Sequence, residues 1–374
     1  MSRTWAYTLS LTAIGLFFIS ISTLFEAQKS LGDPNFFIRK QIIWIIFGLA
    51  AMFITSKLNL DFIRRQSFGL YLISIFLLII IFIPGIGQKA LGASRWINLG
   101  FFNFQPSELF KLTAIIFFPA LFTSEKETGF KHLLIFLLPA FFLIVLEPNL
   151  STALLICAIV VSAYYLSGGP ILPIFTTFLL FSFIGTALIF SSPYRKARFD
   201  TLVNIEQNSD LNYHSQQIII SLAAGGWSGR GIANSEQKYK FLPKISTDSI
   251  LAIIGEETGF IGLLALTYLY ISFISFLFKL AGIVPDMFER VLISSFACWI
   301  SYQALINFAA IVALIPLTGV PFPFISYGGS SLLSIMVTCG LIANIERKYS
   351  HLLYLKHGNY KKDNHHRHSS HSRH

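Results

Sequence analysis

Charged residues are scarce in this sequence, and their scarcity defines the class of protein. Only 12% of the 374 residues are charged, whereas a soluble globular domain carries about 25%. Hydrophobic residues make up 54% of the chain, and 38 residues are phenylalanine. This balance excludes an ordinary soluble domain and is typical of a protein whose surface faces lipid.

Cysteine is also scarce, since Cys157, Cys298 and Cys339 are the three in the chain and all lie within apolar runs. No disulfide framework is therefore expected. A Walker loop and a dinucleotide-binding fingerprint are both missing, so nucleotide binding has little support. The formal charge of +10 comes without a basic segment that alternates with aromatic residues. We therefore expect no nucleic-acid partner and relate the charge to anionic and phosphate-bearing lipids.

Long apolar runs are what the sequence does contain. A membrane span needs about 20 mostly apolar residues, and ten stretches fit this rule. They are 5–25, 37–56, 67–84, 107–123, 131–147, 150–167, 171–191, 249–278, 290–314 and 328–346. No short apolar core with a cleavage site precedes them, so the first stretch is predicted to be an uncleaved helix. The sequence thus predicts an all-α polytopic membrane protein of about ten transmembrane helices, with a large extracytoplasmic loop at 192–248 between helices 7 and 8.

The distribution of Lys and Arg gives a weak orientation. An even number of spans places both ends on one side, and a small excess of cations there favours the cytoplasm. Arg39, Lys40, Arg95 and Lys111 would stay on the outer side against this bias, which often indicates a function. We predict one transmembrane domain over 1–350 and a polar, histidine-rich cytoplasmic tail over 351–374, solvated rather than metal-binding.

A charged pair lies where the fourth predicted helix begins. Pro106 suits a first helical turn, and Glu108 and Lys111 then fall three apart on one face at the membrane edge. Such a pair is costly to bury unless it is mutually paired or faces a polar cavity. An anchoring ion pair and a functional site are equally open. Arg95 and Trp96, just upstream, are either an interfacial anchor or a phosphate-binding arginine beside a lipid-facing ring.

Four further carboxylates lie at or near the ends of predicted helices. Asp248 follows Ser-Thr before an apolar run, an ordinary N-cap signal that suffices to explain it locally. Glu256 and Glu257 lie two turns deeper, where capping does not reach; they have either a function or hydrogen bonds from neighbouring helices. Glu147, at a tight turn between the fifth and sixth helices, is predicted to cap the helix that follows.

Two glycine-rich segments cannot form continuous helices. Prolines and glycines over 316–331 predict a rigid re-entrant turn on the outer side. Ser326, Tyr327 and Ser330 within it either line a polar cavity or satisfy freed backbone groups. Gly225 and Gly226 break the middle of the long outer loop, which either approaches a phosphate or forms a lid over the bundle.

Together these segments resemble the SEDS peptidoglycan glycosyltransferases, the family that includes FtsW, RodA and SpoVE. The motifs are GASRWI at 92–97, QPSELFKL at 105–112, FLP and Thr-Asp within 241–248, IGEETGFIG at 254–262 and PFISYGGSS at 323–331. The resemblance runs from about 39 to 344. NSEQK at 234–238 is closer to FtsW, and GVPFPF at 319–324 is closer to RodA; we favour an FtsW-like protein.

The sequence departs from the family pattern at four positions. Ser246 stands where the family usually has His, and Ser249 stands where an aromatic residue usually follows the Asp. Asn149 and Ser151 replace the usual Asp and Gly after Glu-Pro. None of these changes removes Asp248, although they can alter how its carboxylate is hydrogen-bonded.

The resemblance implies polymerisation of lipid II into β-1,4-linked glycan with release of undecaprenyl pyrophosphate. It implies Asp248 as the general base and Glu108 and Lys111 as cavity residues that position the substrate. Further candidates for substrate contact are Arg95, Trp96, Arg198, Lys244, Ser326 and Tyr327. A divalent cation, Mg²⁺ or Mn²⁺, could help to hold the pyrophosphate, but no ligand cluster identifies a metal site.

The implied location is the bacterial cytoplasmic membrane, with the active site on the outer face. The implied partners are a class B penicillin-binding protein that cross-links the strands and other membrane proteins of the divisome or elongasome. A lipid II flippase and a non-catalytic scaffold of the cell-wall machinery are the alternatives. Asp248 at the membrane rim favours the enzyme, because a transporter is expected to hold its essential charges nearer the midplane.

Overall fold

The computed structural model describes residues 2–85, 87–90, 93–98, 100, 103–124, 129–190, 210–236 and 249–352. Three predicted site residues, Arg198, Lys244 and Asp248, lie outside this part of the chain. The predicted tail lies outside it from residue 353 onward.

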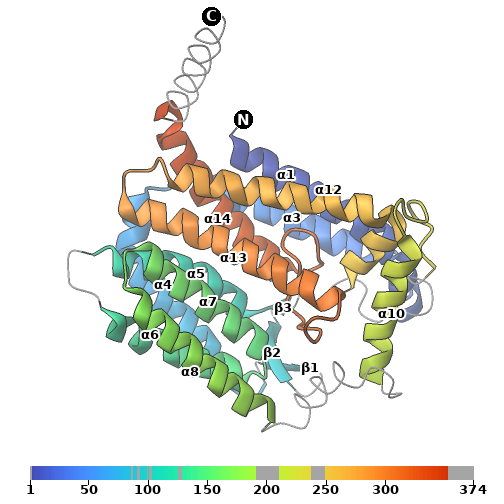
Figure 1. Ribbon diagram of the computed structural model, residues 1–374, viewed down its shortest axis with the longest axis horizontal. Helices are drawn as coiled ribbons and strands as arrows, with labels where there is room; N and C mark the ends of the chain where they lie inside the picture. The colour runs from blue at the N-terminus through green and yellow to red at the C-terminus, as the bar shows by residue number, and fades with distance from the viewer. Residues whose placement is uncertain are drawn as a thin grey trace, which may run out of the picture.

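Helices dominate the described residues, and each of the ten predicted spans coincides with one of them (Figure 1). They are α1 (Arg3–Ser22), α3 (Phe36–Thr55), α4 (Leu60–Ile80), α5 (Pro106–Phe122), α6 (Phe130–Leu146), α7 (Leu150–Leu166), α8 (Ile171–Phe190), α12 (Ile250–Ala281), α13 (Met287–Ile311) and α14 (Gly329–Lys348). Six of them, α1, α3, α4, α12, α13 and α14, are long and apolar enough to cross a membrane. The shorter α6 and α7 are apolar as well. The predicted all-α polytopic membrane protein is confirmed.

Two helices and a small sheet lie between these spans. Helix α2 (Leu24–Leu31) follows α1, and α10 (Asp210–Gly225) precedes α12. Strands β1 (Gly87–Ala90), β2 (Ala93–Asn98) and β3 (Asn103–Phe104) form an antiparallel sheet in that order between α4 and α5. The sheet was not predicted, because its strands are short and separated by glycine. It lies with α10 at one end of the bundle, here called the sheet end (Figure 1).

Helix α4 begins at Leu60, ahead of the predicted start at 67. The Asn59 side chain accepts hydrogen bonds from the backbone N–H groups of Asp61 and Phe62, which is an N-cap. Arg64 lies inside this first polar part of the helix and donates to the Thr123 carbonyl at 2.9 Å. Because hydropathy alone excludes a segment with two arginines, the sequence placed the start too late.

Buried side chains form two clusters that share α4, α5 and α7. One cluster draws on α4, α5, α6 and α7 and is rich in ring contacts, such as Tyr71 against Phe117 at 4.5 Å. The larger cluster joins α1, α3, α12, α13 and α14 to other residues of α5 and α7, including Leu112 and Ile115. Helix α5 is buried on nearly every side from 106 to 119. It is therefore a central helix, although it carries both Glu108 and Lys111.

Small residues allow close packing between α3 and α14. A Cβ atom at Gly329 would collide with the Trp44 ring, and one at Gly340 would collide with Thr55. Close approach over small residues is a usual way to pack membrane helices. The two helices run in the same direction, because positions that increase along α3 meet positions that increase along α14.

The first turn of α1 and the last turn of α14 meet at the end of the bundle that lies opposite the sheet end. The Glu346 carboxylate accepts hydrogen bonds from the backbone N–H of Arg3 at 2.7 Å and of Thr4 at 3.0 Å. It also accepts one from the Thr4 hydroxyl at 2.7 Å. Glu346 on α14 thus caps the N-terminus of α1, and an even number of crossings accounts for this meeting.

Candidate active site

Glu108 and Lys111 form a buried ion pair at the start of α5. Pro106 is the first residue of the helix, so Glu108 falls in the first turn and Lys111 one turn later. The Lys111 Nζ lies 2.8 Å from Glu108 Oε1, and the two side chains are 0% and 3% exposed. An anchor in the headgroup region would be solvated, so the burial of both side chains argues against that alternative. Burial is tolerated because the charges neutralise each other and find further partners.

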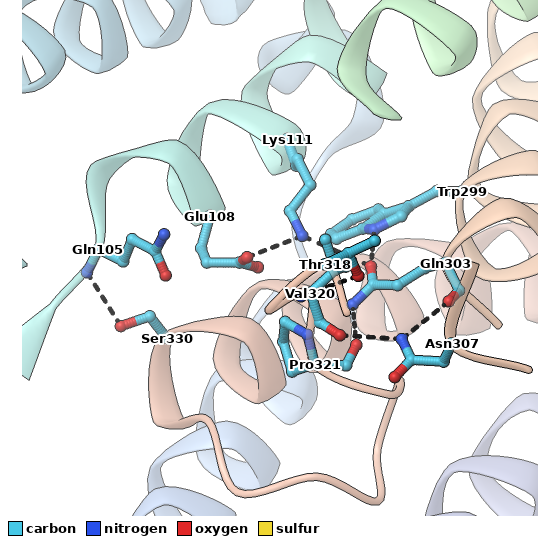
Figure 2. Close-up of polar contacts among 10 residues, drawn as sticks. All are labelled: Gln105, Glu108, Lys111, Trp299, Gln303, Asn307, Thr318, Val320, Pro321 and Ser330. Atoms are coloured by element: carbon cyan, nitrogen blue, oxygen red, sulfur yellow. Dashed lines mark hydrogen bonds and ion pairs between the residues drawn. The ribbon is translucent and has the colours of Figure 1, made fainter. Parts of the chain in front are cut away.

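The further partner of Lys111 is Gln303 on α13 (Figure 2). Gln303 Oε1 accepts hydrogen bonds from Lys111 Nζ at 3.4 Å and from Trp299 Nε1 at 2.5 Å. The ammonium also lies 5.2 Å from the Trp299 ring centroid, within the range of a cation–π contact. Two helices that are far apart in the sequence therefore share one polar network.

The same network holds the segment between α13 and α14, residues 312–328, which we call the re-entrant segment. Gln303 Nε2 donates to the Pro321 carbonyl at 2.6 Å, and Asn307 Nδ2 donates to the Val320 carbonyl at 2.9 Å. The Tyr270 hydroxyl on α12 donates to the Pro323 carbonyl. Backbone groups that proline and a non-helical path leave without partners are satisfied in this way. The predicted rigid, non-helical turn agrees with this structure.

Ser326 and Tyr327 lie in this segment. The Phe322 N–H donates to Ser326 Oγ at 2.9 Å, so this hydroxyl satisfies a freed backbone group. The Tyr327 ring packs edge-to-face against Phe37 with 5.2 Å between centroids.

The start of α14 contacts the start of α5. The Gln105 N–H donates to Ser330 Oγ at 3.2 Å, and the Ser330 hydroxyl donates to the Asn103 carbonyl of β3 at 3.4 Å (Figure 2). Beside this contact, Glu108 Oε2 and the Ser107 hydroxyl are buried without a hydrogen-bond partner in the described structure. A buried carboxylate oxygen in that state can accept a hydrogen bond from a ligand hydroxyl.

Arg95 and Trp96 both lie on β2, where Trp96 pairs with Gln88 of β1. Arg95 Nε donates to the Glu147 carbonyl at 3.0 Å, and its guanidinium also donates to the Pro148 carbonyl. Arg95 therefore joins the sheet to the turn between α6 and α7. These two hydrogen bonds place it in a supporting position at the sheet end.

Glu147 does not cap the following helix, contrary to the sequence prediction. Its own N–H bonds to the Leu143 carbonyl, which makes it the C-cap of α6, and α7 starts only after Pro148. Both carboxylate oxygens are buried without a hydrogen-bond partner among the described residues. Burial raises the pKa of Glu147 to about 8, although the nearby Arg95 charge lowers it in part.

Helix α12 is broken at Gly259, which has φ 68° and ψ −168°. The break leaves backbone groups without helical partners, and residues 226–231 supply them. The Arg230 N–H donates to the Glu256 carbonyl at 2.9 Å, and the Phe260 N–H donates to the Gly226 carbonyl at 2.9 Å. A Cβ at position 259 would lie 2.6 Å from the Trp227 carbonyl oxygen. The turn after α10 is thus fitted into the break in α12.

The Glu256 carboxylate also binds the segment that follows α10. Its Oε2 accepts hydrogen bonds from the Ser221 hydroxyl at 3.0 Å and the Ser235 hydroxyl at 2.6 Å. Its Oε1 accepts one from the Glu236 N–H at 3.0 Å and lies 3.9 Å from the Arg230 guanidinium. Of the two explanations left open by the sequence, these contacts support hydrogen bonding to neighbouring segments.

Sequence reasoning did not identify Trp299, Gln303 and Asn307. A usable signal was present, since Gln303 and Asn307 are two side-chain amides four apart in a mostly apolar span and so lie on one helical face. Within the described ranges, no group of three or more His, Cys, Asp or Glu side chains could hold a metal ion.

Comparison with known proteins places these features in context. The family model for FtsW, RodA and SpoVE, described as "Cell cycle protein", matches residues 1–351. A probable peptidoglycan glycosyltransferase FtsW of Trichlorobacter lovleyi is 31% identical over 344 residues, which cover 90% of each chain. Stage V sporulation protein E of Bacillus subtilis is 33% identical over 352 residues, 91% of this chain and 95% of that one.

Solved structures have the same fold. A chain from a peptidoglycan synthase complex that coordinates polymerization and crosslinking superposes with a TM-score of 0.75 at 25% identity, covering 92% of this chain and 97% of that one. The rod shape determining protein RodA of Thermus thermophilus superposes with a TM-score of 0.68 at 22% identity, covering 92% and 95%.

Proposed function

The chain belongs to the FtsW/RodA/SpoVE family of cell cycle proteins, and from that membership we propose the reaction that its buried polar network serves. The protein is a multi-span peptidoglycan glycosyltransferase. Its reaction is the polymerisation of lipid II into β-1,4-linked glycan with release of undecaprenyl pyrophosphate. Several relatives bear the name FtsW, which favours a role in division; elongation, as in RodA, is the second candidate.

The reaction needs a base and a holder for the leaving group. A sugar 4-hydroxyl attacks the anomeric carbon of a second lipid-linked sugar, the bond from that carbon to the pyrophosphate breaks, and the hydroxyl proton passes to a base. Asp248 is our candidate for this base, on the resemblance of its motif.

The buried Glu108–Lys111 pair is the observation that best supports a substrate site. Lys111 offers a fixed cation for a phosphate oxygen, and Glu108 Oε2 offers an acceptor for a sugar hydroxyl. A pair that served only packing would be expected to cost more than two apolar residues of the same size. The Glu108–Lys111 pair is therefore assigned to holding the lipid-linked substrate.

The remaining candidates have separate places in the proposal. Arg198 and Lys244 are candidates for pyrophosphate contact, and they lie in the segments before and after α10. Arg95 and Trp96 support the rim at the sheet end, and Ser326 and Tyr327 belong to the re-entrant segment. In this proposal the sheet end faces the outer side of the cytoplasmic membrane, where the lipid II headgroup would enter.

A class B penicillin-binding protein is the proposed partner, together with other division or elongation proteins of the membrane. The similar chain from a synthase complex that coordinates polymerization and crosslinking supports this choice. A partner that cross-links strands would receive the glycan as it leaves the sheet end.

The test uses purified protein, together with its class B penicillin-binding protein, and fluorescent lipid II. Glycan ladders are compared for the wild type, Asp248→Ala and the matched control Glu236→Gln, an exposed carboxylate of the same loop. We expect ladders from the wild type and the control and none from Asp248→Ala. Undiminished ladders from Asp248→Ala would overturn its role as the base.

The same preparation separates the alternatives. No polymer from any variant, with lipid II scrambling in liposomes, would favour the flippase. Neither polymer nor scrambling, together with normal complex assembly by Asp248→Ala, would favour the scaffold.

A further inference from the structure

Gln303 connects three parts of the bundle at one buried point. It lies on α13, its side chain is fully buried, and its amide contacts Lys111 of α5 and Pro321 of the re-entrant segment. It also accepts from Trp299, one turn earlier on its own helix. Among the described side chains of α5, Lys111 is the one that forms a hydrogen bond with it.

The partners fix the orientation of the amide. An indole N–H and an ammonium are donors only, whereas a backbone carbonyl is an acceptor only. The amide oxygen must therefore face Lys111 and Trp299, and the amide nitrogen must face Pro321. The reversed orientation would set donors against donors on one side and two oxygens together on the other; Figure 2 shows the orientation that avoids this.

This orientation has a consequence for Lys111. Its ammonium carries three N–H groups, and Glu108 and Gln303 accept two of them. Two fixed acceptors determine the direction of the third N–H. Glu108 alone would not do this, because a single acceptor leaves the ammonium able to rotate about that one hydrogen bond.

We propose that Gln303 is a positioning residue that aims the Lys111 ammonium at a phosphate oxygen of the lipid-linked substrate and ties it to the re-entrant segment. This inference rests on the proposed function, in which Lys111 holds the substrate. Gln303 itself takes no part in bond making, and it acts through Lys111.

Asn307 supplies a matched control. It lies one turn beyond Gln303 on α13 and donates to the Val320 carbonyl, next to the carbonyl that Gln303 holds. It also donates to the Gln303 backbone carbonyl rather than contacting Lys111. Asn307→Leu removes an anchor of the re-entrant segment and leaves the ammonium contact in place.

The first experiment measures KM and kcat for lipid II polymerisation. Gln303→Met preserves the length of the side chain and removes its hydrogen bonds. We expect KM to rise about tenfold, equivalent to about 1.4 kcal/mol, with kcat changed less than about threefold. Asn307 contacts neither Lys111 nor Glu108 and is no part of the proposed substrate site, so Asn307→Leu is expected to lower the thermal midpoint while KM stays within about twofold. Equal rises in KM for the two variants would show a merely structural role and overturn the inference.

The second experiment tests whether Gln303 acts through Lys111. Binding of undecaprenyl pyrophosphate is titrated for wild type, Gln303→Met, Lys111→Met and the double variant. Gln303→Met is expected to weaken binding in the wild-type background and to have no further effect once Lys111 is gone. Additive losses would overturn the inference.

Two outcomes separate this inference from the proposed function. A wild type that neither binds nor polymerises lipid II contradicts the proposed function itself. If Gln303→Met does not fold, Gln303→Glu is used, because it keeps an oxygen toward Lys111 and, when ionised, loses the donor to Pro321. Retained KM in Gln303→Glu supports the positioning role, and a tenfold rise contradicts it.

Discussion

Lys111 Nζ lies 2.8 Å from Glu108 Oε1 within one helix turn of α5, and that turn is enclosed by other helices of the bundle. A purely structural role does not explain why an ion pair should occupy this position. The pair is costly to desolvate, and it lies on a helix that both buried clusters share.

Glu108→Gln should destabilise the protein by about 3–5 kcal/mol, because it leaves the Lys111 charge buried without its partner. The double variant Glu108→Gln with Lys111→Met should recover most of that stability and still fail to polymerise lipid II. Thermal unfolding followed by tryptophan fluorescence, alongside a glycan-ladder assay, measures both effects.

A matched control is the exposed pair of Arg39 and Asp33, whose side chains are 66% and 34% exposed. Asp33→Asn should change stability by less than about 1 kcal/mol, as surface ion pairs contribute little. A double variant at 108 and 111 that polymerises lipid II normally would contradict the assignment of the pair to substrate binding.

Glu147 should make stability depend on pH. Its pKa is raised by burial to about 8, and in the unfolded chain it returns to about 4.3. Between these values the folded state keeps a proton that the unfolded state has lost, so this contribution to stability is complete below about pH 4 and is lost as pH rises to about 8. Within that interval the free energy of unfolding should fall by about 1.4 kcal/mol for each step of one in pH.

The variant Glu147→Gln removes this titration. It should be more stable than the wild type at about pH 8, and the difference should shrink towards about pH 5. Thermal midpoints of both proteins across this range provide the measurement. A constant difference over that range would show that Glu147 titrates normally.

Gly259→Ala should damage the junction between α12 and the turn after α10. The φ of 68° is unfavourable for alanine, and the new Cβ would lie 2.6 Å from the Trp227 carbonyl oxygen. We expect a loss of at least about 1–3 kcal/mol from backbone strain, measured as a lower thermal midpoint.

Gly185→Ala in α8 is the matched control, because a Cβ there meets no atom within 4 Å. An alanine in a helix is favoured over glycine by up to about 1 kcal/mol, so this variant should be unchanged or more stable. A Gly259→Ala protein as stable as Gly185→Ala would mean that the break in α12 can close without cost.

Glu256→Gln should loosen residues 226–236. The carboxylate accepts three hydrogen bonds at 2.6 to 3.0 Å, and hydrogen bonds to a charged group contribute about 1.5–3 kcal/mol. Hydrogen–deuterium exchange in this segment should become about tenfold to a hundredfold faster.

Glu236→Gln tests whether the charge of that loop alone has the same effect. Its side chain is exposed and pairs with Arg230 at 2.7 Å, so exchange should change little. Equal acceleration in both variants would show that Glu256 does not hold the turn.

Hydropathy predicted the helices well because each span is a long apolar run that local sequence determines. The strands between α4 and α5 were not predicted, since their pairing depends on residues such as Trp96 and Gln88 meeting across a turn. The late start predicted for α4 has a similar cause: Arg64 looks too polar for a span until its contact with Thr123 is known.

The part of the candidate site that depends on local sequence was predicted, and the part that depends on helix packing was not. Glu108 and Lys111 are recognisable from their spacing on one helix. Gln303 contacts Lys111 only because α13 packs against α5, and no local sequence pattern predicts that packing. For Glu147 the local rule favoured a cap, whereas the fold makes it the last residue of the turn that ends α6.

The contact of Glu346 with the first turn of α1 has a consequence for biosynthesis. The residues it joins are 343 apart in the chain, which at about 5–20 residues per second takes roughly 17 to 70 seconds to translate. During that interval the first turn of α1 has the Ser2 N-cap but not the Glu346 carboxylate. Assembly of the bundle therefore finishes only when the last helix is made. A chain truncated before Glu346 should leave the Arg3 and Thr4 N–H groups without this acceptor and should be degraded faster by membrane proteases.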